Sequence, residues 1–141
     1  MVHDANWIAA TAYLGSATCT AVTITSPTTI STVNVGDSGY ALFRVVPENN
    51  PNRTTTSDSG EKRTTTSIQL VYETVPGQVK FNFPHQLGGQ YGDAVKDVGV
   101  EMTHDFENGD ILVVFSDGVS DNMTVKEFLP CIDQYLNEDA V

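Results

Sequence analysis

The stretch DILVVFSDGVSDNM, residues 110–123, decides the fold of this chain. Its apolar run from Ile111 to Phe115 is typical of a buried strand. The run stops at Ser116, Asp117 and Gly118, and a second aspartate, Asp121, follows four residues after the first. Since scaffolds display functional groups on loops at strand ends, these carboxylates are candidates for a functional site.

Each of these aspartates also has a plain structural interpretation. Aspartate is a common turn residue, Asp117-Gly118 reads equally well as a simple turn, and Asp121 is explained by the positive end of a following helix. A third aspartate, Asp37, lies in the short segment GDSG (36–39) between two strand-like runs. For each of the three aspartates considered alone, the structural interpretation is the better one. The functional hypothesis therefore depends on their occurring together.

Length and composition indicate one soluble globular domain of intracellular type. The chain has 141 residues, 40% of them hydrophobic, and no apolar run near the ~20 residues of a membrane span. The first fifteen residues show neither a secretory signal nor an Arg-rich presequence, so we expect an intracellular protein, with cytoplasm and mitochondrion both open. Cys19 and Cys131 fit no zinc spacing and are predicted to be buried, reduced thiols.

The charge is concentrated in the second half of the chain. The net charge is −11, and residues 71–141 hold thirteen acids and three basic residues, which is −10 of that total. So acidic a surface repels nucleic acid and anionic lipid, and we expect neither as a partner. Acids that converge on one point would instead require a cation.

Runs rich in Val, Ile and Thr predict most of the chain to be strands. From the pattern we expect strands at 18–24, 29–35, 40–46, 67–75, 98–106 and 111–116. The glycine-bracketed segment 36–39 predicts a hairpin and hence three neighbouring antiparallel strands at the start of the chain. Asn108-Gly109 predicts a second hairpin, and the polar segment at about 47–67 predicts a flexible insert.

A helix is expected near the end of the chain. Thr124 and Glu127 have the spacing of a capping box, and an apolar stripe at helical spacing follows. Pro130 lies inside this segment, so we expect it to bend or delay the helix.

Four motifs in order resemble those of the PPM or PP2C family of metal-dependent serine/threonine protein phosphatases. They are GSATCTAVTI, VNVGDSGYALFR, FNFPHQL and GDILVVFSDGVSDNM, and together they span about residues 15–136. FNFPHQL and the Asp-Asn-Met ending are similar to the PTC7-like branch. The resemblance implies an α+β fold, an α-β-β-α sandwich of antiparallel sheets, over a single domain at 1–141 that is a partial version of the family's domain.

The resemblance also implies a chemistry. In this family Mg²⁺ or Mn²⁺ ions activate a water that hydrolyses phosphoserine and phosphothreonine in proteins, with no catalytic residue beyond the metal ligands. By position Asp117 matches a ligand of the core metals, and Asp37 and Asp121 match ligands of an additional, weaker metal. Gly118 would let the backbone pass close to the ion. A phosphoprotein is the implied substrate.

The departures from the family pattern leave a second function open. An Asp-Gly-x-Gly motif upstream and an acidic pair downstream have no counterpart, so we expect the middle part of such a domain. The basic candidates for holding a phosphate, Arg53, Lys62 and Arg63, lie in the predicted insert. The alternative is therefore a catalytically inactive, phosphatase-like binding or regulatory module. We also expect exposed sheet edges, which a dimer or another partner would cover.

The histidines and glycines carry no competing site in the sequence. His3, His85 and His104 share no metal-ligand spacing and no hydrolase triad pattern. The glycine-rich GGQYGD (88–93) is not followed by Lys-Ser or Lys-Thr, so a P-loop is excluded.

Overall fold

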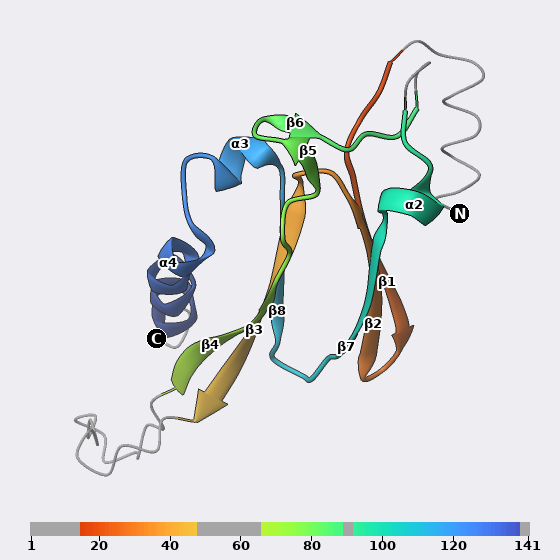
Figure 1. Ribbon diagram of the computed structural model, residues 1–141. Helices are drawn as coiled ribbons and strands as arrows, with labels where there is room; N and C mark the ends of the chain where they lie inside the picture. The colour runs from red at the N-terminus through yellow and green to blue at the C-terminus, as the bar shows by residue number, and fades with distance from the viewer. Residues whose placement is uncertain (1–14, 48–65, 89–91, 139–141) are drawn as a thin grey trace, which may run out of the picture.

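Two three-stranded antiparallel sheets form the body of the chain. The structure is a computed structural model that describes residues 15–47, 66–88 and 92–138. The first sheet has the order β1-β2-β7 and the second has the order β4-β3-β8, and Figure 1 shows them side by side. Their strands are β1 (Cys19–Ser26), β2 (Thr29–Val35), β3 (Gly39–Pro47), β4 (Thr66–Glu73), β7 (Val100–Asp105) and β8 (Ile111–Phe115).

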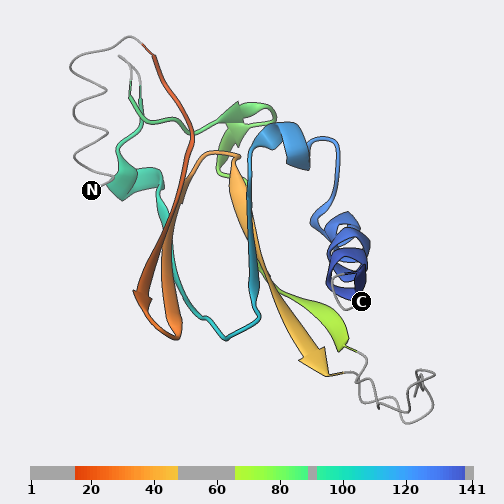
Figure 2. The ribbon, with the colours of Figure 1, turned by 180° about the vertical axis from the view of Figure 1, so that it is seen from behind.

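The remaining elements are short, apart from one helix. They are a two-stranded ribbon of β5 (Gln78–Lys80) and β6 (Phe83–Pro84), the single turns α2 (Val95–Val98) and α3 (Asp117–Ser120), and the helix α4 (Val125–Glu138). Figures 1 and 2 place α4 on the outer face of the β4-β3-β8 sheet, and place α3 beside the β5–β6 ribbon at one end of the molecule.

β3 is the centre of the structure because both of its faces are covered. Ala41 and Phe43 are completely buried and pack with Val125 and Phe128 of α4. Tyr40, which points to the other face, hydrogen-bonds across to the first sheet. A strand buried on both faces requires apolar residues at successive positions, as the run from Tyr40 to Phe43 has.

Polar side chains join the two sheets at Tyr40. The hydroxyl groups of Tyr40 and Thr32 on β2 are 2.7 Å apart, and the Tyr40 hydroxyl is also 2.7 Å from Nε2 of His104 on β7. The ring of Tyr72 on β4 lies 4.5 Å from the His104 ring, centre to centre. β4 therefore faces β7 across the space between the sheets.

Both predicted hairpins are wrong in their pairing. β2 pairs with β1 and β7, while β3 pairs with β4 and β8, so the glycine-bracketed loop 36–38 carries the chain from one sheet to the other. The same holds for β7 and β8 on either side of Asn108-Gly109. The physical reason is burial: α4 covers one face of β3, and the sheet that contains β2 covers the other face, which it could not do if β3 paired with β2 in the same sheet.

The segments α2 and α3 and the short β5–β6 ribbon were not predicted as regular structure. The predicted helix is confirmed: the Glu127 carboxylate accepts hydrogen bonds from the Thr124 backbone N–H (2.7 Å) and hydroxyl (2.8 Å), and α4 continues through Pro130. The prediction of two buried thiols is wrong, because Cys19 is half-buried and Cys131 is exposed.

The α+β class and the sandwich of antiparallel sheets are confirmed, and neither sheet closes within the described residues. β3 ends at Pro47 and β4 begins at Thr66, so both ends of the predicted insert belong to strands. The rest of that insert, including Arg53, Lys62 and Arg63, lies outside the described residues, as does His3. β8 is only half-buried, contrary to the prediction of a buried strand, because it lies at the edge of its sheet.

Candidate metal centre

The register of β3 with β8 brings two of the candidate aspartates to the same end of one sheet. Gly39 pairs with Phe115 as the last pair of this antiparallel ladder. Asp37 lies two residues before Gly39, and Asp117 lies two residues after Phe115, so both follow directly from the end of the ladder. Figure 1 shows this end at the top, where the β2–β3 loop and α3 meet the β5–β6 ribbon.

Asp37 is held in a tight, buried loop. Its residue is 6% exposed, and its Oδ2 accepts a hydrogen bond of 3.4 Å from Nε2 of Gln78, the first residue of β5. Gly36 precedes it with φ +96°, and the Gly36 carbonyl accepts a 2.8 Å hydrogen bond from the N–H of Gly77. A Cβ on Gly36 would lie 2.7 Å from the carbonyl oxygen of His85, so glycine is required here by space and by conformation.

Asp117 and Asp121 lie at the two ends of α3. Asp117 is the first residue of this turn and is exposed, and its Oδ1 accepts a 2.8 Å hydrogen bond from the N–H of Gly118. Asp121 ends the turn, and its N–H donates to the Asp117 carbonyl at 2.7 Å. A Cβ on Gly118 would approach only the Ser116 hydroxyl, at 3.6 Å, so packing does not require glycine at this position.

These carboxylates suit a hard divalent cation in kind but do not form a closed ligand set. Mg²⁺ and Mn²⁺ prefer carboxylate oxygens, and Asp37 and Asp117 emerge at one end of one ladder. Across residues 15–47, 66–88 and 92–138, however, no three His, Cys, Asp or Glu side chains gather closely enough to hold a metal. The assignment of Asp37, Asp117, Gly118 and Asp121 as metal ligands stays a prediction.

A histidine–carboxylate pair beside the Asp37 loop was missed in the sequence. Nδ1 of His85 lies 3.0 Å from Oδ2 of Asp93, and the same oxygen accepts a hydrogen bond from the N–H of Gln86 at 3.1 Å. The N–H of His85 donates to the Gly77 carbonyl at 3.0 Å, which ties the pair to the Asp37 loop. The signal in the sequence was weak, because seven residues, including two adjacent glycines, separate His85 from Asp93.

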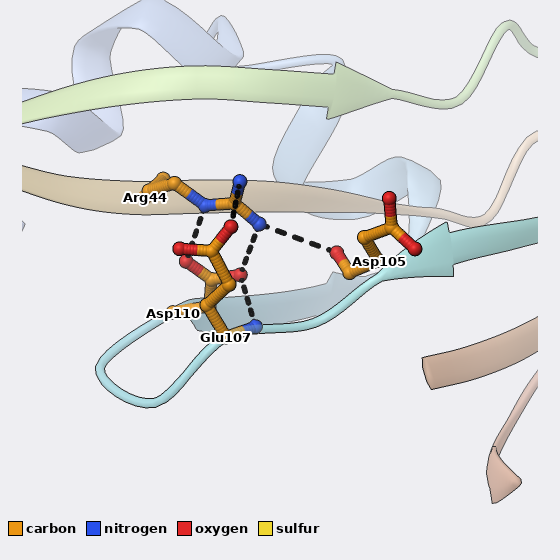
Figure 3. Close-up of polar contacts among 4 residues, drawn as sticks. All are labelled: Arg44, Asp105, Glu107 and Asp110. Atoms are coloured by element: carbon orange, nitrogen blue, oxygen red, sulfur yellow. Dashed lines mark hydrogen bonds and ion pairs between the residues drawn. The ribbon is translucent and has the colours of Figure 1, made fainter. Parts of the chain in front are cut away.

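The best-formed ion pair lies at the opposite end of the sheets. Figure 3 shows that Arg44 of β3 contacts residues of the β7–β8 connection. Its Nε and one terminal nitrogen donate hydrogen bonds to the Asp110 carboxylate at 2.9 and 2.8 Å. The other terminal nitrogen lies 2.7 Å from Glu107. The Arg44 hydrogen bond holds the pKa of Asp110 below its ordinary value, and the pKa of Arg44 is raised by the same contact. Arg44 is thus engaged far from the candidate metal centre.

Comparison with known structures identifies the fold. The chain resembles a solved structure described as "X-ray structure of the photosystem II phosphatase PBCP", with a TM-score of 0.65 and 22% sequence identity. The likeness covers 94% of this chain and 46% of the other. This is the fold of part of a PP2C-like phosphatase. At this level of identity the likeness extends to the fold alone, and the chain spans less than half the length of that structure.

Comparisons with protein-family models and with curated proteins gave no match. In the part of the chain that the structure describes, none of the helices has the length and apolar character needed to span a membrane.

Proposed function

We propose that this chain belongs to a metal-dependent protein phosphatase of the PP2C type, in the PTC7-like branch, which hydrolyses phosphoserine and phosphothreonine in proteins. Two lines of support are independent. The four sequence motifs occur in the order that the family has, and the fold of nearly the whole chain is similar to that of a solved phosphatase. An intracellular location, in cytoplasm or mitochondrion, goes with this proposal.

One observation carries the proposal: the β3–β8 ladder ends where Asp37 and Asp117 begin their loops. These residues are eighty positions apart in the chain, and the pairing of β3 with β8 puts both at the same end of one sheet. Carboxylates that lie close together repel each other unless a cation lies between them, so carboxylates at one end of a sheet favour the binding of a cation there.

The metal in this proposal is Mg²⁺ or Mn²⁺. Asp117 would be a ligand of the core ions, and Asp37 and Asp121 would be ligands of an additional, weaker ion. The backbone near Gly118 would pass close to the ion, and water or residues beyond these would complete the oxygen shells. When bound, such an ion lowers the pKa of water and so supplies a nucleophile at neutral pH.

The residues of the chain itself orient the site. The amide of Gln78 donates to the Asp37 carboxylate at 3.4 Å, and Asp37 lies in the buried loop that follows Gly36. Asp117, by contrast, is exposed, and among the hydrogen bonds described its carboxylate accepts only from the N–H of Gly118, so it is open to a ligand from solvent.

The proposal is tested by metal binding and by turnover measured separately. We expect Mn²⁺ to bind in isothermal titration calorimetry and Asp117→Asn to weaken binding by about tenfold, which is about 1.4 kcal/mol. Asp97→Asn, an exposed aspartate on α2, is the matched control and should leave binding unchanged. Mn²⁺-dependent hydrolysis of p-nitrophenyl phosphate and of a phosphothreonine peptide then tests catalysis. Equal binding by all three proteins would refute the ligand assignment.

A second function, a phosphatase-like binding or regulatory module without catalysis, is favoured by one feature of the site. Within the described residues the acids do not form a three-ligand group, and one Asp117 oxygen is already bonded to the Gly118 N–H. Metal binding without hydrolysis of either phosphate compound would support this module over the enzyme.

A further inference from the structure

The outer edge of β7 is a strand edge without a partner in the described part of the chain. β7 pairs with β2 on one side, from Val100 opposite Asn34 to Asp105 opposite Thr29, and it is the last strand of its sheet. An edge strand directs alternate N–H and C=O groups away from the sheet, where they are available to another strand.

Apolar side chains of β7 that face the space between the sheets are exposed at this edge. Thr32 faces that space, because its hydroxyl contacts Tyr40 of the opposite sheet, and its register partner Met102 faces the same way. Met102 is 37% exposed and Val100, two residues before it, is 47% exposed. Inner-face residues of a closed sandwich are buried, so the space beside β7 has room for a further strand.

The opposite face of β7 is acidic. Glu101, Thr103 and Asp105 alternate with the apolar residues and are exposed. β7 itself carries no lysine or arginine, and neither do the other strands of its sheet, β1 and β2. Arg44 of β3 contacts only the last residue of β7, through the backbone carbonyl of Asp105 at 3.3 Å. A second copy of this chain would bring equal negative charges together along the edge, which disfavours self-pairing.

We propose that the free edge of β7 binds an extended polypeptide strand in which apolar residues alternate with basic ones. Its apolar side chains would cover Val100 and Met102, its basic side chains would lie beside Glu101 and Asp105, and its backbone would continue the β1-β2-β7 ladder. Strand addition of this kind takes its affinity from main-chain hydrogen bonds and its specificity from alternate side chains. This surface is separate from the candidate metal centre and independent of catalysis.

The test uses the full chain and fluorescein-labelled peptides of about seven residues, long enough to pair with a strand of this length. One peptide alternates valine with lysine, a second has the same composition in two blocks, and a third alternates valine with glutamate. By fluorescence anisotropy the first should bind at least about tenfold more tightly than the other two. Equal binding of the block peptide would overturn the proposal, because net charge alone would then explain the affinity.

Two variants locate the site. Met102→Lys should weaken binding of the valine–lysine peptide by about tenfold or more. Ile24→Lys makes the same change on β1, at the far edge of the sheet, where Ile24 is 71% exposed, and should have no effect. Equal loss in both variants would contradict the assignment to β7.

Hydrogen exchange gives a readout on the unaltered chain, so the proposal stays testable if Met102→Lys fails to fold. Bound peptide should slow exchange of the β7 amides and leave those of β1 unchanged. Unprotected β7 amides would refute strand addition. Sedimentation equilibrium tests the alternative that a second copy of the chain occupies this edge. A dimer that Met102→Lys dissociates would assign the edge to a second copy and overturn the proposal.

Discussion

At the scale of single residues, a residue's position relative to the β3–β8 ladder does not determine how deeply its side chain is buried. Asp37 and Asp117 extend the same β3–β8 ladder, yet Asp37 is buried with Gln78 as a donor and Asp117 is exposed. The sequence predicted both as loop carboxylates, because apolar runs ending in Gly and Asp mark strand ends clearly. The difference in burial depends on Gly77 and Gln78, which come from a distant segment of the chain. It could therefore not be inferred from the residues next to Asp37.

His104 should make stability depend on pH. Burial lowers the pKa of His104, which keeps the ring neutral beside the Tyr40 hydroxyl. The unfolded chain therefore binds more protons than the folded chain between the ordinary histidine pKa of about 6.5 and the lower folded value. The free energy of unfolding should fall as pH decreases through this window, by at most about 1.4 kcal/mol per pH unit, and then level off.

Urea unfolding between pH 8 and pH 5 measures this effect. His104→Gln should remove most of the pH dependence in the window, whereas His85→Gln should retain the part due to His104. An unchanged slope in His104→Gln would show that another group is responsible.

At the scale of elements, α4 and the β7–β8 connection both contact β3: α4 packs on Ala41 and Phe43, and Arg44 binds the connection through Asp110. The α4 prediction succeeded because its signals, a capping box and an apolar stripe, are local. Strand pairing failed because the glycine turns at 36–38 and 108–109 bend the chain without specifying which sheet it enters. Which sheet each strand joins depends on the packing of α4 against β3 and on the hydrogen bonds from Arg44 to Asp110. Both are contacts between residues far apart in sequence.

Phe128→Ala should strongly destabilise the chain. Phe128 is 9% exposed, packs in the cluster with Ala41 and Phe43, and makes an edge-to-face contact with Phe115. Truncation of a buried aromatic residue costs about 3 kcal/mol or more, because it removes buried area and leaves a cavity. Urea unfolding measures the loss, and Tyr135→Ala on the exposed side of α4, where Tyr135 is 64% exposed, should change stability by less than about 0.5 kcal/mol.

Asp110→Asn should loosen the β7–β8 connection. The Asp110 side chain is 1% exposed and accepts from Arg44 and from the N–H of Glu107 at 2.9 Å, so loss of its charge weakens several contacts together. We expect a cost of about 1–3 kcal/mol in the free energy of unfolding. Asp105→Asn, whose side chain points away from Arg44 in Figure 3, is the matched control. A cost equal to that of the control would contradict the role of the ion pair.

At the scale of the whole molecule, the sheets are joined by a small polar and aromatic network, and their edges are open within the described residues. The sandwich architecture was predictable through the order of four motifs, since motif order reflects topology. The cross-sheet contacts of Tyr40 with Thr32 and His104 were not, because nothing in a strand pattern shows which residue lies opposite in the other sheet.

Tyr40→Phe tests how much this network contributes to the association of the sheets. The ring remains, but Thr32 and His104 lose the buried hydroxyl that both contact. A cost of about 1–2 kcal/mol is expected, because unpaired polar groups remain in the interior. Tyr135→Phe, at an exposed position, is the control for urea unfolding. A cost no larger than that of the control would show that the network adds nothing to stability.

The alternation of the strands between the sheets has a consequence for folding kinetics. β7 completes the sheet begun by β1 and β2, and β8 completes the sheet of β3 and β4, so each sheet combines early and late parts of the chain. The mean sequence separation of contacting residues is therefore large, and loop closure must precede most strand pairing. Folding should take milliseconds to seconds, as in slow β-sandwiches, and synthesis must pass β7 before the first sheet can be complete and β8 before the second can be.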